Sequence, residues 1–126
     1  MPELPDDMMY TENHEWIKKE KDVIRYGITD YAQEELGDIV YVELPMEDEE
    51  FEKGDVIGVI ESVKTVSDLY APVSGQIKKV NSKLEDSPEL INDDPYGDGW
   101  ITTIEIEDEA ELEQLLSAEK YETHTE

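Results

Sequence analysis

The chain has 126 residues, of which 35 are acidic and ten are basic, so its formal net charge is −25, and it contains no cysteine. A length of this order supports one hydrophobic core, and we expect a single domain over residues 1–126. The charge repels phosphate backbones and anionic lipids, which argues against nucleic-acid and membrane partners. The missing cysteines exclude disulfides and thiolate chemistry by the chain itself.

The sequence has neither of two features that would direct the chain to secretion or to a membrane. Residues 1–16 are acidic and lack the basic segment and apolar stretch of a secretory signal. No apolar run approaches the roughly 20 residues that cross a bilayer. We therefore predict a cytoplasmic protein.

The excess of acids has two further interpretations. High charge with modest hydrophobicity is typical of disordered chains, but seven tyrosines, two tryptophans and patterned apolar segments predict a folded domain. The acids are spread along the whole chain, which favours a halophilic surface that is kept soluble in a salt-rich cytoplasm.

The first third of the chain predicts short strands and one helix. We expect loose order in residues 1–9, followed by two strands within residues 14–28 around a charged turn. A short helix is predicted for residues 29–37. Thr29 is its expected N-cap, and Gly37 suits the left-handed conformation that ends a helix.

The remaining elements are mostly strands. The sequence predicts a strand stopped by Pro45, an acidic turn at 46–55, strands at 56–62 and 66–73, a long loop at 85–99 and a last strand at 100–107. Asp108 is then expected to cap a C-terminal helix with Glu111 as its capping-box partner and Leu112, Leu115 and Leu116 as its buried stripe. Loose order is expected again in residues 122–126.

These elements predict a mainly β fold, a flattened barrel or sandwich of two small antiparallel sheets with short helices. A weak internal echo relates "GDIVYVELP", from Gly37, to "GDVIGVIES", from Gly54. Two similar half-sheets facing each other would produce it, and so would chance.

Metal binding and catalysis find little support. An EF-hand starting at Asn92 would place Tyr96 at loop position 5 and Thr103 at position 12, where acids or amides are required. His14 and His124 are the only imidazoles, and no Gly-rich phosphate loop occurs. We predict no catalytic residue, no metal site and no enzymatic activity of the chain alone.

One lysine has an unusual setting. Lys64 lies near the reversal between two apolar strands, flanked by Glu61 and Asp68. An exposed turn lysine is the ordinary interpretation. A lysine at a hairpin tip can also enter the active site of a modifying enzyme, which must accept the proton of its ammonium group.

The segment "ESVKTVSDLYAPVSG" (61–75) resembles the lipoyl-attachment motif of the glycine cleavage system H proteins. "HEW", "GITDYAQEELGDIVYVELP", "SPELIN" and "PYGDGWI" resemble other family segments in the same order. The resemblance runs from about Tyr10 to Tyr121. It implies a lipoyl-domain fold with lipoic acid joined to Lys64 by an amide bond. The attachment motif then includes Glu61, Ser62, Val63 and Asp68.

The resemblance also implies a function. H proteins are carriers, loaded with the aminomethyl group of glycine by a pyridoxal-phosphate glycine decarboxylase (the P protein). A tetrahydrofolate-dependent aminomethyltransferase (the T protein) unloads them, and dihydrolipoyl dehydrogenase (the L protein) reoxidises the dithiol. A lipoyl-attaching enzyme is a further expected partner, and we expect the carrier to be a monomer. Tethering raises the effective concentration of the arm at each encounter.

The family further implies a cleft that shelters the loaded arm. Glu15 is the acidic contact that the family pattern maps onto this chain, and Asp68 is a second candidate from its place in the hairpin. An acid suits a charged amine, and exclusion of water slows hydrolysis. Some members have a histidine where this chain has Glu35, so no histidine contact is assigned there.

Other carriers of swinging arms are alternatives. Biotinyl domains typically place methionines beside the lysine, where this chain has Val63 and Thr65. Lipoyl domains of 2-oxo-acid dehydrogenases usually have Asp and Ala there, within longer chains. A lipoyl relay that donates lipoate to other complexes and an unmodified binding homologue remain open.

The halophilic interpretation predicts a salt-dependent fold. Lowering salt from molar to millimolar removes the screening of 35 acids and is expected to lower the melting temperature. Thermal unfolding over a salt series measures this directly, and a constant melting temperature would count against adaptation to salt.

Overall fold

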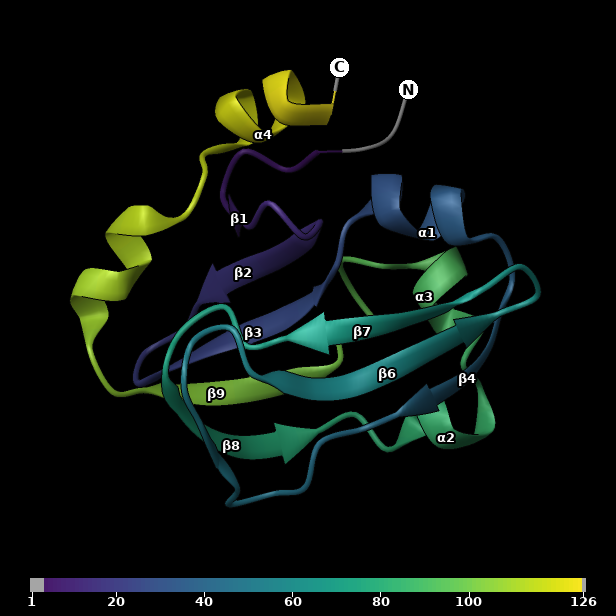
Figure 1. Ribbon diagram of the computed structural model, residues 1–126, viewed down its shortest axis with the longest axis horizontal. Helices are drawn as coiled ribbons and strands as arrows, with labels where there is room; N and C mark the ends of the chain where they lie inside the picture. Colours follow the sequence, from purple (N-terminus) through teal and green to yellow (C-terminus); the bar gives the residue numbers. More distant parts are fainter. Residues whose placement is uncertain (1–3, 126) are drawn as a thin grey trace.

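The computed structural model describes residues 4–125, which form two packed antiparallel sheets and several short helices (Figure 1). The strands are β1 (Met9–Tyr10), β2 (Glu15–Lys19), β3 (Val23–Ile28), β4 (Ile39–Glu43), β5 (Glu50–Phe51), β6 (Val56–Ser62), β7 (Val66–Tyr70), β8 (Gly75–Val80) and β9 (Thr102–Ile106). The helices are α1 (Asp30–Leu36), α2 (Lys83–Asp86), α3 (Leu90–Asp93), the 3₁₀ helix η1 (Glu109–Gln114) and α4 (Ala118–Thr125).

The two sheets differ in size. One has six strands in the order β1-β2-β3-β9-β8-β5, and the other has three in the order β4-β6-β7. Every strand pairing is antiparallel. The predicted mainly β fold of two antiparallel sheets with short helices is confirmed.

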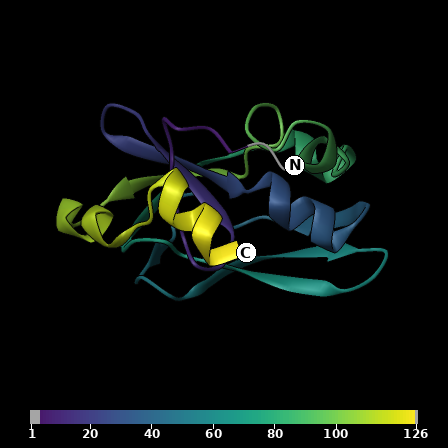
Figure 2. The same cartoon turned by 90° about the horizontal axis from the view of Figure 1, so that it is seen from above.

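The core lies between the sheets because alternate strand residues point to opposite faces. Its fully buried aliphatic members include Ile17, Ile24, Ile60, Ile77 and Ile104. A second cluster lies under α4 and joins Met8, Tyr10, Trp16, Ala118 and Tyr121. Seen from above, α4 lies beside α1, and the β6–β7 hairpin extends past α1 (Figure 2).

Helix α1 begins and ends at the residues that the sequence predicts. The Thr29 hydroxyl accepts a hydrogen bond from the Ala32 amide at 3.1 Å, as an N-cap does. Gly37 follows the last turn with φ +80°, a conformation that residues with a Cβ rarely adopt. The predicted cap and stop of this helix are both confirmed.

The C-terminal elements differ from the predicted single helix because tertiary contacts intervene. Asp108 does cap through its side chain, but the helix it opens is the 3₁₀ helix η1. The capping-box prediction for Glu111 is wrong, because its carboxylate instead accepts hydrogen bonds from the amide and hydroxyl of Ser74 at 2.7 and 3.2 Å. Leu116 lies beyond η1 in an isolated bridge to Tyr10, and the α-helix at the C-terminal end is α4.

Two other segments carry more regular structure than expected. The predicted loop at 85–99 contains α3 and the last two residues of α2, and the predicted acidic turn at 46–55 contains the two-residue strand β5. Each of these helices has four residues with one buried apolar anchor, Leu84 in α2 and Ile91 in α3. Helices and strands this short give too little periodicity to detect.

The chain ends are described in part. Met8 is buried, and residues 122–125 continue α4. Residues 1–3 and 126, also expected to be loosely ordered, lie outside the described residues. Within residues 4–125 no helix is long and apolar enough to cross a membrane.

The internal echo does not correspond to facing half-sheets. Gly37 and Gly54 both have positive φ and precede β4 and β6, and these strands are neighbours in one sheet. The structure gives no physical reason to derive the two segments from a duplication.

Substitution of Gly58 tests the packing of the three-stranded sheet. A Cβ at Gly58 would lie 2.5 Å from the backbone oxygen of Glu43 on β4. Gly58→Ala should therefore lower the free energy of unfolding in urea by about 1–3 kcal/mol, because the backbone oxygen of Glu43 cannot move away without distorting β4. Val56→Ala, at an exposed site on the same strand, is the control. If Gly58→Ala and Val56→Ala have equal free energies of unfolding, a Cβ at position 58 is not crowded by β4.

Candidate functional site

The tip of the β6–β7 hairpin is a tight, hydrogen-bonded turn. The Ser62 amide donates to the Thr65 carbonyl oxygen at 2.8 Å. The Ser62 hydroxyl oxygen accepts from the amides of Lys64 and Thr65 at 3.1 Å each, a local side-chain closure typical of serine. The Val63 amide donates to the Asp38 carbonyl oxygen at 3.0 Å. These bonds fix the backbone that carries Lys64.

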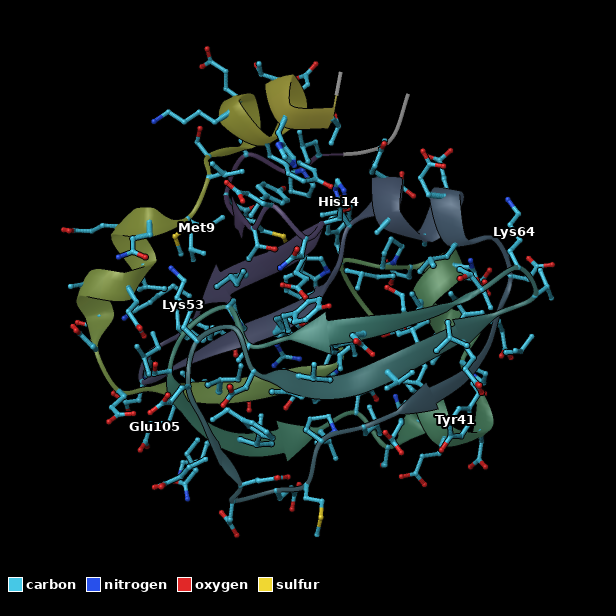
Figure 3. All side chains as sticks on the ribbon, in the orientation of Figure 1. Met9, His14, Tyr41, Lys53, Lys64 and Glu105 are labelled. Carbon is cyan, nitrogen blue, oxygen red and sulfur yellow. The ribbon has the colours of Figure 1, made fainter. Side chains whose placement is uncertain are left out.

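The Lys64 side chain lies exposed at this tip (Figure 3). A Cβ placed on Gly37 would come within 3.2 Å of the Lys64 Cε atom and 3.8 Å of Nζ. The lysine therefore lies over a notch that exists because residue 37 has no side chain. Within residues 4–125 no carboxylate lies within ion-pair distance of Lys64 Nζ.

A cleft of about 230 Å³ lies between α1 and the hairpin. Most of its buried lining residues are apolar, and its exposed lining residues are polar. Its lining comprises Asn13, His14, Glu15, Ile28, Tyr31, Ala32, Glu35, Leu36, Ile60, Ser67, Asp68 and Leu69. Asp68 and Glu35 are exposed, and His14 is half-buried. The cleft combines apolar packing with several carboxylates, which suits an amphipathic, positively charged guest.

Glu15 lines the cleft as a buried carboxylate, only 2% exposed. Its Oε2 accepts from the Tyr26 hydroxyl at 2.8 Å and from the Tyr70 amide at 3.0 Å. Its Oε1 accepts from the Thr11 hydroxyl at 3.0 Å. Both oxygens are thus already bonded to groups from three parts of the chain.

Burial raises the pKa of Glu15 to about 7, although its three hydrogen bonds oppose the shift. The geometry is consistent with this, since the Tyr26 hydroxyl oxygen also lies 3.0 Å from the Tyr70 carbonyl oxygen, and its single proton cannot serve both acceptors. A protonated Glu15 can donate to Tyr26, which leaves the Tyr26 proton for that carbonyl. Burial and the nearby Glu15 also raise the pKa of Tyr26 well above its ordinary value.

A second group of polar residues lies at the top of the cleft. His14 has φ +67° and stacks at a tilt on Tyr31 of α1, with ring centres 4.9 Å apart. A hydrogen bond to Glu35 raises the pKa of Tyr31. His14 Nδ1 lies 2.8 Å from the Tyr121 hydroxyl of α4. The α4 helix is thus joined to the cleft wall.

The structure divides the predicted site residues into two places. Lys64 and Val63 lie at the tip, with Glu61 and Ser62 at the end of β6. Asp68 on β7 and Glu15 on β2 line the cleft instead.

Sequence reasoning assigned Glu15 and Asp68 to the cleft but not its other lining residues, among them Tyr31, Glu35 and His14. Tyr31 and Glu35 are spaced i, i+4 on a predicted helix, so they could have been assigned to one face. His14 gave no such signal, because neighbouring residues of an extended strand point to opposite faces and only its left-handed backbone turns it beside Glu15.

Metal binding finds no support in the described region: residues 4–125 contain no group of three or more His, Asp or Glu side chains placed to hold an ion. The chemistry that the geometry offers is an accessible amine at a rigid tip and an acidic, partly apolar cleft nearby.

Comparison with known proteins gives one consistent result. Residues 8–126 match the family model described as glycine cleavage H-protein. The chain is 56% identical over 118 residues, 94% of each chain, to glycine cleavage system H proteins of two strains of Staphylococcus epidermidis. It is also similar to the crystal structure of a glycine cleavage system H protein from Mycobacterium marinum. That likeness has a TM-score of 0.87 and 41% identity, and covers 97% of this chain and 98% of the other.

The raised pKa of Glu15 predicts a specific pH dependence. A carboxyl whose pKa is near 7 when folded and 4.5 when unfolded stabilises the fold fully below pH 4.5. That contribution is lost as the pH rises through 7, at a cost of up to about 3 kcal/mol. Glu15→Gln should remove this dependence, which urea unfolding at pH 5 and pH 8 will measure.

Glu43→Gln, at an exposed position of β4, is the matched control for the loss of one charge. If Glu15→Gln and Glu43→Gln change stability equally at the two pH values, Glu15 does not titrate as described.

Proposed function

Because the chain belongs to the glycine cleavage H-protein family, we propose that Lys64 is the residue that carries its lipoyl group, through an amide bond. The family supplies the lipoyl carriers of the glycine cleavage system, which shuttle an aminomethyl group and are not themselves catalysts. The chain is such a carrier. The observation that carries the assignment to Lys64 is its exposed position at the fixed hairpin tip.

The residues around Lys64 fit an attached arm. The notch over Gly37 gives the aliphatic part of the lysine a place to lie, and a side chain there would fill it. Val63 and Val66 flank the tip and are 66% and 59% exposed, which leaves apolar surface beside the amine. An attaching enzyme can approach this tip and accept the ammonium proton. Glu61, Ser62 and Val63 lie within the surface it would contact.

The chain and the arm have separate tasks. When bound, the lipoyl group supplies the sulfur chemistry that a cysteine-free chain lacks, accepting the aminomethyl group and later being reoxidised. The protein fixes the place from which the arm extends. The Ser62 and Asp38 contacts hold the tip still, so that the arm alone searches for each partner.

We also propose that the cleft beside α1 shelters the loaded arm. Asp68 and Glu35 are exposed carboxylates on opposite walls, and either can pair with a charged amine. Glu15 is buried in the same cleft with both oxygens occupied, so it offers the amine no free oxygen. The apolar residues Ile28, Ile60 and Leu69 exclude water from the buried part of the cleft.

The wider setting follows from the same family. The glycine cleavage system implies the P, T and L proteins as partners. We propose that the carrier is a cytoplasmic monomer, with a lipoyl-attaching enzyme as a further partner and an acidic surface adapted to salt. Three ion pairs occur among the described residues, so most of the acids remain for solvent cations or for basic partner surfaces.

Substitution of Lys64 tests the attachment. Lys64→Arg keeps the positive charge, but a guanidinium stays protonated and does not form the amide. The variant should fold with an unchanged melting temperature and show no lipoyl mass after expression with the attaching enzyme. Carrier activity with the three partner enzymes should be lost.

Lys53→Arg is the matched control, since Lys53 is another exposed turn lysine, one residue before Gly54. It should retain the adduct. Glycine cleavage by Lys64→Arg at the wild-type rate, or an adduct mapped outside residues 54–78, would overturn the assignment.

A further inference from the structure

The C-terminal helix α4 is anchored through one tyrosine. Tyr121 is 1% exposed, and its ring stacks on Tyr10 with ring centres 4.9 Å apart. Its hydroxyl lies 2.8 Å from the Thr29 hydroxyl and 2.8 Å from His14 Nδ1. Thr29 begins α1, and His14 lines the cleft. One hydroxyl group therefore connects α4 with the N-cap of α1 and with the cleft residue His14.

The direction of each hydrogen bond among Thr29, Tyr121 and His14 follows from counting the protons and acceptors that the three side chains have. Thr29 is fully buried, and its oxygen already accepts from the Ala32 amide. Among residues 4–125, its own proton has the Tyr121 oxygen as its acceptor. Tyr121 then has a single proton of its own, and the partner left for it is His14 Nδ1. The bonds run in one direction, from α1 through α4 to the imidazole.

We propose that Tyr121 is a positioning residue for the cleft, holding His14 as the neutral tautomer that carries its proton on Nε2. An imidazole that accepts at Nδ1 cannot also be protonated there. The inference rests on the proposed function of the cleft as the shelter of the loaded arm. It extends that function to a residue of α4, which does not line the cleft.

The charges around His14 are consistent with a neutral ring. On α4 it faces Tyr121 and His124, and on α1 it faces Tyr31 and Glu35. Burial lowers the pKa of His14, the neighbouring His124 lowers it further, and Glu35 opposes them.

The other two ionisable residues of the cleft are Glu15 and Asp68, and neither can add a positive charge. A protonated His14 would add a positive charge to a wall that we propose receives a charged amine. Holding the ring neutral removes this repulsion, and holding it by Nδ1 fixes its plane against Tyr31. Acidification should reverse both effects, since a proton on Nδ1 breaks the bond from Tyr121.

Nitrogen-15 NMR of the lipoylated protein tests the tautomer directly. At pH 8 the wild-type His14 ring should show a protonated Nε2 and an unprotonated Nδ1. Tyr121→Phe keeps the ring stack on Tyr10 and deletes only the hydroxyl. In this variant the titration of His14 should move to higher pH, because the neutral form has lost a hydrogen bond.

A second measurement concerns the cleft. After loading by the glycine decarboxylase, the aminomethyl group should be lost to water about fivefold faster in Tyr121→Phe, the factor expected for one hydrogen bond. Tyr10→Phe is the matched control. It deletes another buried hydroxyl from the same stack, one that bonds to the Pro5 carbonyl oxygen and not to His14.

The outcomes separate the two proposals. A wild-type ring with its proton on Nδ1, or equal effects of Tyr121→Phe and Tyr10→Phe, would overturn the role of Tyr121 and leave the cleft proposal intact. If loading shifts no resonance of His14, Glu35 or Asp68 in the wild type, the cleft is not the shelter, and Tyr121 positions nothing for it. The expected tautomer together with a selective loss of protection in Tyr121→Phe would support both.

Discussion

The buried carboxyl group of Glu15 is the contact on which the rest of the molecule depends. It accepts hydrogen bonds from Tyr26 on β3, in the six-stranded sheet, and from the Tyr70 amide on β7, in the three-stranded sheet. It also bonds to Thr11, which precedes β2. A buried acid is costly to ionise, so satisfying it fixes the spacing of the two sheets at one place. That place is the floor of the cleft, and fold and site therefore share one constraint.

Helix α1 is the second common element. Its N-cap Thr29 contacts α4, its residues Tyr31 and Glu35 line the cleft, and Gly37 after its last turn makes the notch for Lys64. Seven residues are too few to form a stable helix alone, so its position is set by these tertiary contacts. The helix couples the hairpin tip, the cleft and the C-terminal helix, because each of them contacts a different part of it.

Local chemistry explains what could be predicted from the sequence. The cap at Thr29, the stop at Gly37 and the hairpin around Lys64 depend on neighbours in the chain, and all are present. The Glu111 capping box failed because Ser74, 37 residues away, offered two donors. His14 was missed for a similar reason: its position depends on a left-handed backbone and on Tyr121, 107 residues distant. Long-range hydrogen bonds leave no pattern in a single sequence.

The tethered tip has a consequence for how the carrier meets its partners. Since the Val63 amide donates to the Asp38 carbonyl oxygen and Ser62 closes the turn, the backbone from which the proposed arm on Lys64 would extend is held by hydrogen bonds on both sides. A lipoyl group attached there, as proposed, would reach outward from one held point on the surface. The P, T and L proteins that the glycine cleavage system implies would each have to bring an active site within reach of that point. Their common feature should be the depth of their entrance channels.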